Sequence, residues 1–224
     1  MAGALWSDVK VRIKNKCAFD SDTMIDTSDL TFDHDFCKQA REHLYAFTEK
    51  AKIIHAMRVK LNTAALTAGI YQIDTLNDSV MPAAYQALIE AEQLWINGRE
   101  VQCFAMGQPH TETSYTVSQG QPLFYRYVED YILAFDCPLS DTELDSNDNY
   151  VSGWFMHPII TADNNMVKLP FKFIDIFAEY SAAELMRSVV SDDVGLTRLR
   201  MYEKRTTQAI LDCNARATAS AYGA

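Results

Sequence analysis

The longest apolar pattern in the chain lies in its last third, residues 168–216. From Phe171 to Val190, hydrophobic residues occupy almost every face of a helix. A helix that is apolar nearly all round is typical of one buried among other elements. Leu169-Pro170 precedes it, and proline is tolerated in a first helical turn because its missing N–H has no partner there. The sequence therefore predicts a buried helix that begins directly after Pro170.

A second helix is predicted to follow after a short polar break at residues 191–193. Its apolar positions are three and four residues apart, at Leu199, Tyr202, Thr206, Ala209, Cys213 and Ala217. Charged residues lie between them, so this helix has one buried face and one exposed face. The two helices together predict a helical hairpin.

The first hundred residues also contain helical spacing. Residues 34–62 show the clearest stripe, at Phe36, Ala40, Leu44, Phe47, Ala51, Ile54 and Leu61. A further helix is predicted over 81–96, with Ala84, Leu88, Ala91 and Trp95 on one face and Asn97-Gly98 at its end. Residues 5–17 fit both the helix period and the strand period, and the helix is favoured. Residues 18–33 are turn-rich and predict a surface loop or an arm that wraps a neighbouring subunit.

From Arg99 the pattern changes to short segments rich in aromatic and β-branched residues. The predicted strands are 101–105, 115–117, 123–128, 131–135 and 154–160, separated by turn clusters. Residues 136–150 contain acidic but no basic side chains, which predicts a solvated loop.

These patterns predict an α+β fold, a bundle of about four long helices with a small antiparallel β domain inserted between the second and third. The predicted parts are a helical part over 1–98 that includes the arm, a β domain over 99–163, and a helical hairpin over 164–216 that packs on the N-terminal helices. Residues 217–224 are small and uncharged and predict a flexible tail.

Composition limits the classes of function. The chain has 224 residues and a net charge of −10, which disfavours broad binding to duplex DNA and would suit a channel that lets DNA slide. No apolar run reaches the ~18 residues of a membrane span, and the N-terminus lacks a secretory pattern. Five dispersed cysteines predict free, mostly buried thiols in a reducing cytosol.

Motifs that would indicate catalysis are missing from the sequence. It contains no phosphate-binding glycine loop, no HExxH or CxxC pair and no GxSxG elbow. His34, between Asp33 and Asp35, could bind a cation or cap the following helix. We therefore predict no catalytic, cofactor-binding or metal-binding residues, and no enzymatic activity.

The order of the segments resembles the head-to-tail adaptor proteins of tailed bacteriophages, also called tail tubular or gatekeeper-ring proteins. The similarity is strongest over residues 167–213, where VKLPFKFIDIFAEYSAAELMRSVV is followed by DDVGLTRLRMYEKRTTQAILDC. The segment Gly120-Gln121-Pro122-Leu123-Phe124 is similar to part of the family's small β domain. The N-terminal third lacks the family's usual opening. The match is closest to the adaptors of short-tailed phages.

The resemblance implies a structural virion protein of the neck or tail, made in the host cytoplasm. It implies a homo-oligomeric ring, commonly a dodecamer, docked under the portal protein and in contact with a tail or nozzle protein, with DNA passing through the lumen. The candidate partner contacts are the basic residues and the tail tyrosine of the last helix: Arg198, Arg200, Lys204, Arg205, Arg216 and Tyr222. Another neck or tail assembly protein, an enzyme with a non-local active site and a DNA-binding regulator stay open as alternatives.

Overall fold

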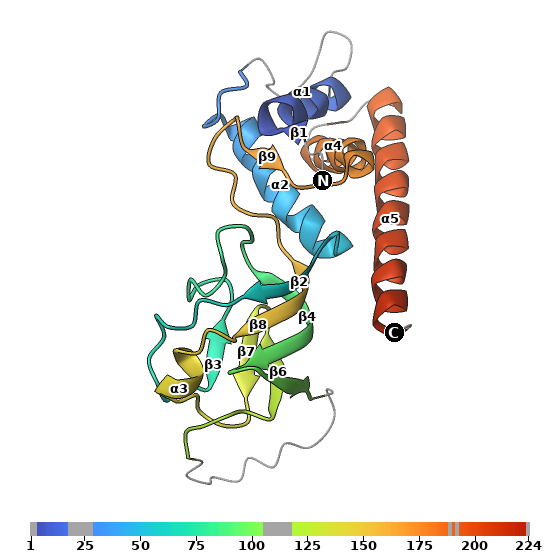
Figure 1. The fold of residues 1–224 in the computed structure, drawn as a ribbon. Helices are drawn as coiled ribbons and strands as arrows, with labels where there is room; N and C mark the ends of the chain where they lie inside the picture. The colour runs from blue at the N-terminus through green and yellow to red at the C-terminus, as the bar shows by residue number, and fades with distance from the viewer. Residues whose placement is uncertain (1–3, 18–28, 105–117, 188–189, 191–192, 223–224) are drawn as a thin grey trace. The chain divides into compact units, whose positions relative to one another are not determined.

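The structure, a computed structural model, describes residues 4–17, 29–104, 118–187, 190 and 193–222, with side chains described as far as Arg216. The chain divides into two compact units. The helical unit comprises Met1–Ile54 and His157–Ala224, and the sheet unit comprises His55–Met156. The sheet unit is therefore inserted into a helical unit that both ends of the chain build (Figure 1).

Among the residues that the structure describes, the helical unit contains four helices and a short two-stranded sheet. The helices are α1 (Trp6–Cys17), α2 (Asp35–Ala51), α4 (Phe171–Met186) and α5 (Asp193–Tyr222). Strand β1 (Ala4–Leu5) pairs antiparallel with β9 (Met166–Val167). Their core is continuous and includes Trp6, Phe47, Phe177 and Met186. Helix α4 contributes to this core from almost all its faces, as its apolar sequence predicted.

Local signals explain where α2 begins and ends. The side chain of His34 accepts a hydrogen bond from the backbone N–H of Phe36 at 3.3 Å, so it is the N-cap. Of the two roles open to His34 it therefore has the capping one. Lys52 follows the last turn with a left-handed backbone (φ 45°), which stops the helix and turns the chain into the sheet.

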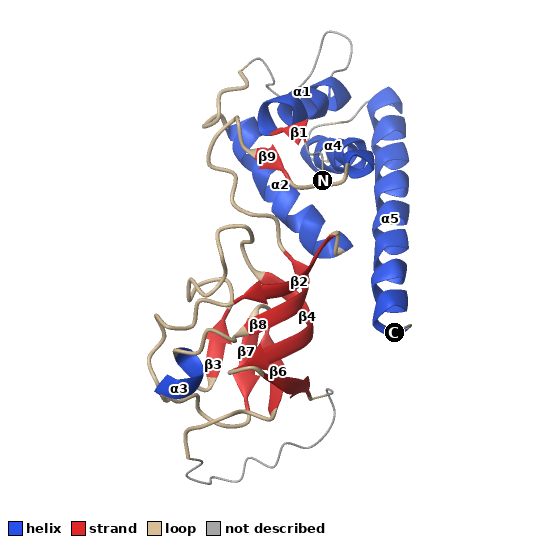
Figure 2. Cartoon of the chain, in the orientation of Figure 1, coloured by secondary structure: helices blue, strands red, loops and turns tan. Residues whose placement is uncertain are grey.

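In the described part of the sheet unit, seven strands form one mixed sheet in the order β2-β8-β4-β5-β6-β7-β3. The strands are drawn in red in Figure 2. The strands are β2 (Ile54–Lys60), β3 (Gln72–Asp74), β4 (Leu88–Ile96), β5 (Arg99–Cys103), β6 (Phe124–Glu129), β7 (Ile132–Phe135) and β8 (Tyr150–Phe155). β5 and β6 are parallel, whereas β4–β5, β4–β8, β6–β7 and β3–β7 are antiparallel. The short helix α3 (Asp141–Leu144) precedes β8.

The sheet curls, and this brings side chains of β6 into contact with β4 across the intervening β5. The phenol oxygens of Tyr125 and Tyr127 both bond to the backbone of Ala91. The interior of the curl is filled by buried residues that include Ile73, Leu94, Leu133 and Phe155.

The predicted bundle of about four long helices with a small antiparallel β insert is wrong. Residues 81–96 were predicted as a helix but contain β4, and the helix predicted over 34–62 ends at Ala51, after which β2 begins. The sheet consequently takes residues from the part predicted to be helical, has seven strands and includes a parallel pair. The sheet unit begins at His55 and ends at Met156, whereas the sequence placed the β domain at 99–163.

Two β-bulges explain why β4 resembles a helix in sequence. The register of β4 against β8 shifts between Leu88 and Glu90 and again between Ala91 and Gln93. Each bulge adds one residue to β4, so its core-facing positions become Leu88, Ala91 and Leu94, three residues apart instead of two. Leu88 and Ala91 therefore keep the spacing of three that is typical of one face of a helix, whereas Trp95, predicted on that same helix face, lies on the opposite side of the sheet.

Other predictions have mixed outcomes. Residues 6–17 are helical, α4 and α5 are confirmed, and the strands predicted near 123–128 and 131–135 are present as β6 and β7. Segment 136–150 is not a solvated loop throughout, since Glu143, Leu144 and Asn149 are buried. The backbone of 217–222, predicted as a flexible tail, continues α5. Residues 18–28 of the predicted arm and the strand predicted at 115–117 lie outside the described residues. In the part of the chain that the structure describes, no helix has the length and hydropathy of a membrane span.

Candidate interaction surfaces on helix α5 and the sheet

Helix α5 packs on the rest of the helical unit through the stripe that its sequence predicted. Leu199, Tyr202, Thr206 and Cys213 are buried. The Asn214 side-chain amide adds a hydrogen bond to the carbonyl of Lys50 at 3.0 Å. The helix is thus held along its length, which fixes the direction in which its opposite face points.

That opposite face is exposed and combines basic with apolar side chains. We define the outer face of α5 as Thr197, Arg200, Met201, Lys204, Gln208 and Leu211, which recur every three or four residues and are all exposed. Met201 is 46% exposed and Leu211 57%, which is high for large hydrophobic side chains. A long helix that displays such residues on its free side has the composition of a contact surface for a protein.

The six candidate contact residues do not lie together. Arg200 and Lys204 are on the outer face, and neither has a hydrogen bond or ion pair within the described chain. Arg205 instead binds Glu179 of α4, with Nη1 2.8 Å from Oε1. Arg198 is only partly exposed, whereas Arg216 is exposed near the end of α5. The side chain of Tyr222 lies outside the described residues.

Glu179 is the residue that sequence reasoning missed. It is 1% exposed, and it binds Lys16 of α1 at 2.9 Å as well as Arg205 of α5. A buried carboxylate needs such partners because the low-dielectric interior penalises an unpaired charge. The sequence alone does not single out Glu179, because Asp175 and Glu184 are also carboxylates of α4. Arg205 is therefore committed to holding three helices together.

A second exposed surface lies on the side of β4 and β8 that faces away from the sheet interior. Trp95 pairs with Tyr150 in the register, and Trp154 is two positions further along the same face of β8. We define Trp95, Tyr150 and Trp154 as the aromatic face, and all three are partly exposed. Glu100 of β5 pairs with Trp95 in the register and is exposed, so a carboxylate borders these rings.

Neighbouring side chains on β2 and β4 complete this surface. The ring of His55 lies 4.8 Å from that of Trp154, and its Nε2 is 2.8 Å from Oε2 of Glu92. The Arg58 guanidinium lies 5.0 Å from the ring centre of Tyr150. The aromatic face is therefore ordered by contacts to its neighbours. Sequence analysis missed it because Trp95 was assigned to a helix.

Charge is divided unevenly between the two units. The sheet unit holds thirteen acidic and four basic residues, a net charge of −9 out of −10 for the whole chain. The helical unit has seventeen acidic and sixteen basic residues, a net charge of −1. The acidic character of the protein is thus a property of the sheet unit. The net charge of this unit is opposite in sign to the basic side chains on the outer face of α5.

Most of the cysteine side chains are buried in the interior of the protein. All five cysteines are free thiols, and four of them are buried, as predicted. Burial raises the pKa of Cys17 to about 12, which keeps that thiol protonated and unreactive. His43 contacts the Ser181 hydroxyl at 3.0 Å, and burial lowers its pKa. Across the described ranges, no three His, Cys, Asp or Glu residues converge in a way that could hold a metal ion.

The two exposed surfaces are the features of this molecule that call for a partner. The outer face of α5 is basic and apolar, and the aromatic face belongs to an acidic unit. Comparison with known proteins adds no candidate for that partner, because no protein-family model and no curated protein matches the chain.

Proposed function

We propose that the protein is a structural subunit of a head-to-tail connector ring in a bacteriophage of the short-tailed kind. The observation that carries the proposal is the α4–α5 pair, formed by the same segment on which the resemblance rests. α4 is buried in the helical core, and α5, which is 30 residues long, packs against α4 and has an exposed face with basic and apolar side chains. This pair has the design expected of a scaffold that presents a long helix to neighbouring subunits.

In this role the protein is a homo-oligomer, a ring of the dodecameric kind, located in the neck or tail of the virion after synthesis in the host cytoplasm. The ring docks under the portal protein and meets a tail or nozzle protein on its other side. The charge distribution supports passage of DNA. A ring of sheet units, each with a net charge of −9, repels the phosphate backbone and lets duplex DNA move without sticking.

The last turns of α5 are the proposed portal contact. Arg216 is exposed there, and the backbone continues in helical form to Tyr222. A basic helix end suits an acidic surface on a partner, because complementary charge speeds and orients docking. The resemblance assigns the contact with the tail or nozzle protein to the β domain, and so to the sheet unit.

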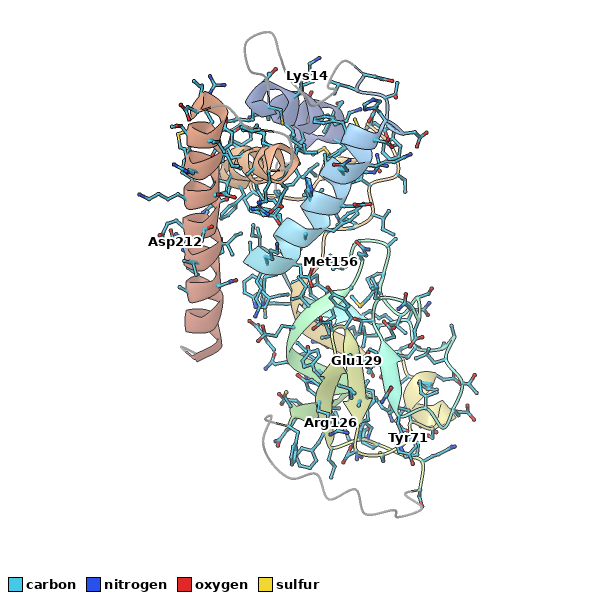
Figure 3. All side chains as sticks on the ribbon, turned by 180° about the vertical axis from the view of Figure 1, so that it is seen from behind. Lys14, Tyr71, Arg126, Glu129, Met156 and Asp212 are labelled. Carbon is cyan, nitrogen blue, oxygen red and sulfur yellow. The ribbon has the colours of Figure 1, made fainter. Side chains whose placement is uncertain are left out.

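The test uses purified protein, a purified portal ring and two matched variants. The wild type should give rings in negative-stain images and a multiple of the subunit mass by light scattering. Arg216→Glu should weaken portal binding by about tenfold, a rim-charge effect. Arg126→Glu, an exposed arginine of the sheet unit that is labelled in Figure 3, makes the same charge change and should bind the portal as the wild type does.

A wild type that stays monomeric and does not bind the portal ring would contradict the connector assignment. A second candidate, another neck or tail assembly protein, is supported by the same exposed apolar residues, Met201 and Leu211. Pull-down of the tagged protein from assembled particles separates the two candidates. A connector should recover the portal protein, whereas another neck or tail component should recover only tail proteins.

A further inference from the structure

We infer that the outer face of α5 docks on the aromatic face of the sheet unit in a second copy of this chain. This inference rests on the proposed function and names the contact between neighbouring subunits of the ring. One surface belongs to the helical unit and the other to the sheet unit, and the residues of each surface come from that unit only.

The first argument is electrostatic. Arg200 and Lys204 are exposed, lie one turn apart and have no ionic partner within the described chain. The aromatic face is bordered by exposed carboxylates, Glu100 on β5 and Asp148 just before β8. Asp148 lies beside the Asn97–Gly98 turn, where its Cβ would be 3.6 Å from a methyl group added at Gly98. Arg200 and Lys204 are thus opposite in sign to Glu100 and Asp148. Each surface also has one charge of the other sign, Asp212 beside Gln208 on α5 and Arg58 over Tyr150 on the sheet.

The second argument is chemical. Met201 and Leu211 are exposed on the same side of α5 as the two cations. Tryptophan and tyrosine rings are favourable surfaces for methionine, leucine and the guanidinium or ammonium groups of Arg and Lys. The aromatic face supplies three such rings at the surface of a rigid sheet, so each component of the helix face has a counterpart.

The third argument is geometric. The two surfaces are different parts of one chain, so a contact between them is heterologous and leaves one free copy of each surface at the two ends of a dimer. Such a contact propagates from subunit to subunit and closes into a ring when the rotation allows. Self-association through a single two-fold patch would stop at a dimer.

Charge-reversal variants test the inference directly. The helix variant is Arg200→Glu/Lys204→Glu, and the sheet variant is Glu100→Lys/Asp148→Lys. Each should lower self-association by about 100-fold, because it places like charges opposite each other. The matched controls change the same charge elsewhere. They are Lys14→Glu/Arg126→Glu for the helix variant and Glu129→Lys/Asp130→Lys for the sheet variant, and both should associate as the wild type does. Lys14, Arg126 and Glu129 are labelled in Figure 3.

Mixing the two variants gives the decisive measurement. In a 1:1 mixture the native α5 of the sheet variant can dock on the native aromatic face of the helix variant. The two reversed surfaces are again opposite in charge, so association should recover at least to heterodimers. Analytical ultracentrifugation at low and high salt measures this, and the heterodimer should weaken at high salt. A mixture that stays monomeric, or variants that still form rings alone, would overturn the inference.

The outcomes separate this contact from the connector assignment. If both variants still form rings and bind the portal, the connector assignment stands and the docking surface is wrong. If the wild type is monomeric and does not bind the portal, both fail. If the wild type is monomeric and instead binds a short DNA duplex, with binding lost in the helix variant alone, the outer face of α5 is a nucleic-acid site and the docking inference is overturned.

Discussion

The side-chain nitrogen of Asn149 lies 2.6 Å from the hydroxyl oxygen of Thr63, in the buried interior of the sheet unit. The same nitrogen donates to the carbonyl of Glu143 at 2.6 Å, and the side-chain oxygen accepts from the backbone N–H of Asn97 at 2.7 Å. Thr63 in turn donates to the carbonyl of Leu144 at 2.6 Å. One buried amide thus joins the end of β2, helix α3 and the β4–β5 turn.

Asn149→Ala should lower the free energy of unfolding by about 3 kcal/mol, because it leaves several buried polar groups without a partner. Urea denaturation followed by circular dichroism measures the change. The matched control is Asn147→Ala, where an exposed side chain accepts from Lys60 at 2.9 Å. Its cost should stay below about 0.5 kcal/mol. Equal effects of the two variants would show that the buried network contributes nothing special.

Gly153 is required where β8 passes the bulged part of β4. A Cβ at this position would lie 2.1 Å from the backbone oxygen of Glu90, and rigid backbone cannot move aside cheaply. Gly153→Ala should therefore cost roughly 3 kcal/mol of unfolding free energy, as overpacking of a core does. Gly120→Ala is the control, because its Cβ would meet nothing within 4 Å. Thermal and urea denaturation should show a near-native Gly120 variant and a destabilised Gly153 variant.

The helical half of this fold was more predictable than the sheet for a physical reason. The buried helix α4 and the stripe of α5 depend on residues a few positions apart, so their pattern is visible in the sequence. The bulges of β4 depend on its pairing with β8, more than fifty residues away, and they destroy the period of two. One local signal was available, however. Asn97 and Gly98 both have positive φ (51° and 72°) in the β4–β5 turn, and Asn-Gly is the pair that such hairpins favour.

The candidate surfaces divide in the same way. The exposure of Arg200 and Lys204 follows from the stripe of α5 and was predictable. The ion pair between Arg205 and the buried Glu179 was not predictable, because Glu179 lies 26 residues earlier and meets Arg205 only when α4 and α5 pack. The aromatic face needs the register that sets Trp95 opposite Tyr150, which no local pattern reveals.

Acid should destabilise the protein through His157. Its Nε2 accepts from the backbone N–H of Lys168 at 2.8 Å, so the ring proton is on Nδ1, which donates to the carbonyl of Pro158 at 2.6 Å. The side chain is fully buried, and this burial lowers the pKa of His157 from 6.5 to about 4. Between these values the unfolded chain binds a proton that the folded chain does not, so stability falls as pH falls.

The loss attributable to His157 should be about 3 kcal/mol between pH 7 and pH 4, at about 1.4 kcal/mol per unit of pKa difference. Urea denaturation of the wild type and of His157→Gln at several pH values measures it. The variant should be less stable at neutral pH but should lose about 3 kcal/mol less on acidification. Parallel pH profiles for the two proteins would contradict this role of the histidine.

Lys16 and Arg205 should be non-additive, because both neutralise the buried Glu179. Either cation alone can hold the carboxylate, so Lys16→Gln and Arg205→Gln should each cost about 1 kcal/mol of unfolding free energy. The double variant strands a buried charge and should cost about 4 kcal/mol, more than the sum.

Adding Glu179→Gln to that double variant removes the stranded charge, so it should restore about 2 kcal/mol of unfolding free energy. An exposed ion pair provides the comparison. Arg187 and Glu203 lie 3.0 Å apart at the surface, and their double variant should be additive within about 0.5 kcal/mol. Urea denaturation of the wild type and of all single and multiple variants measures the coupling free energy of Lys16 with Arg205 and that of Arg187 with Glu203. Additive behaviour at Lys16 and Arg205 would contradict the shared role of the two cations in holding Glu179.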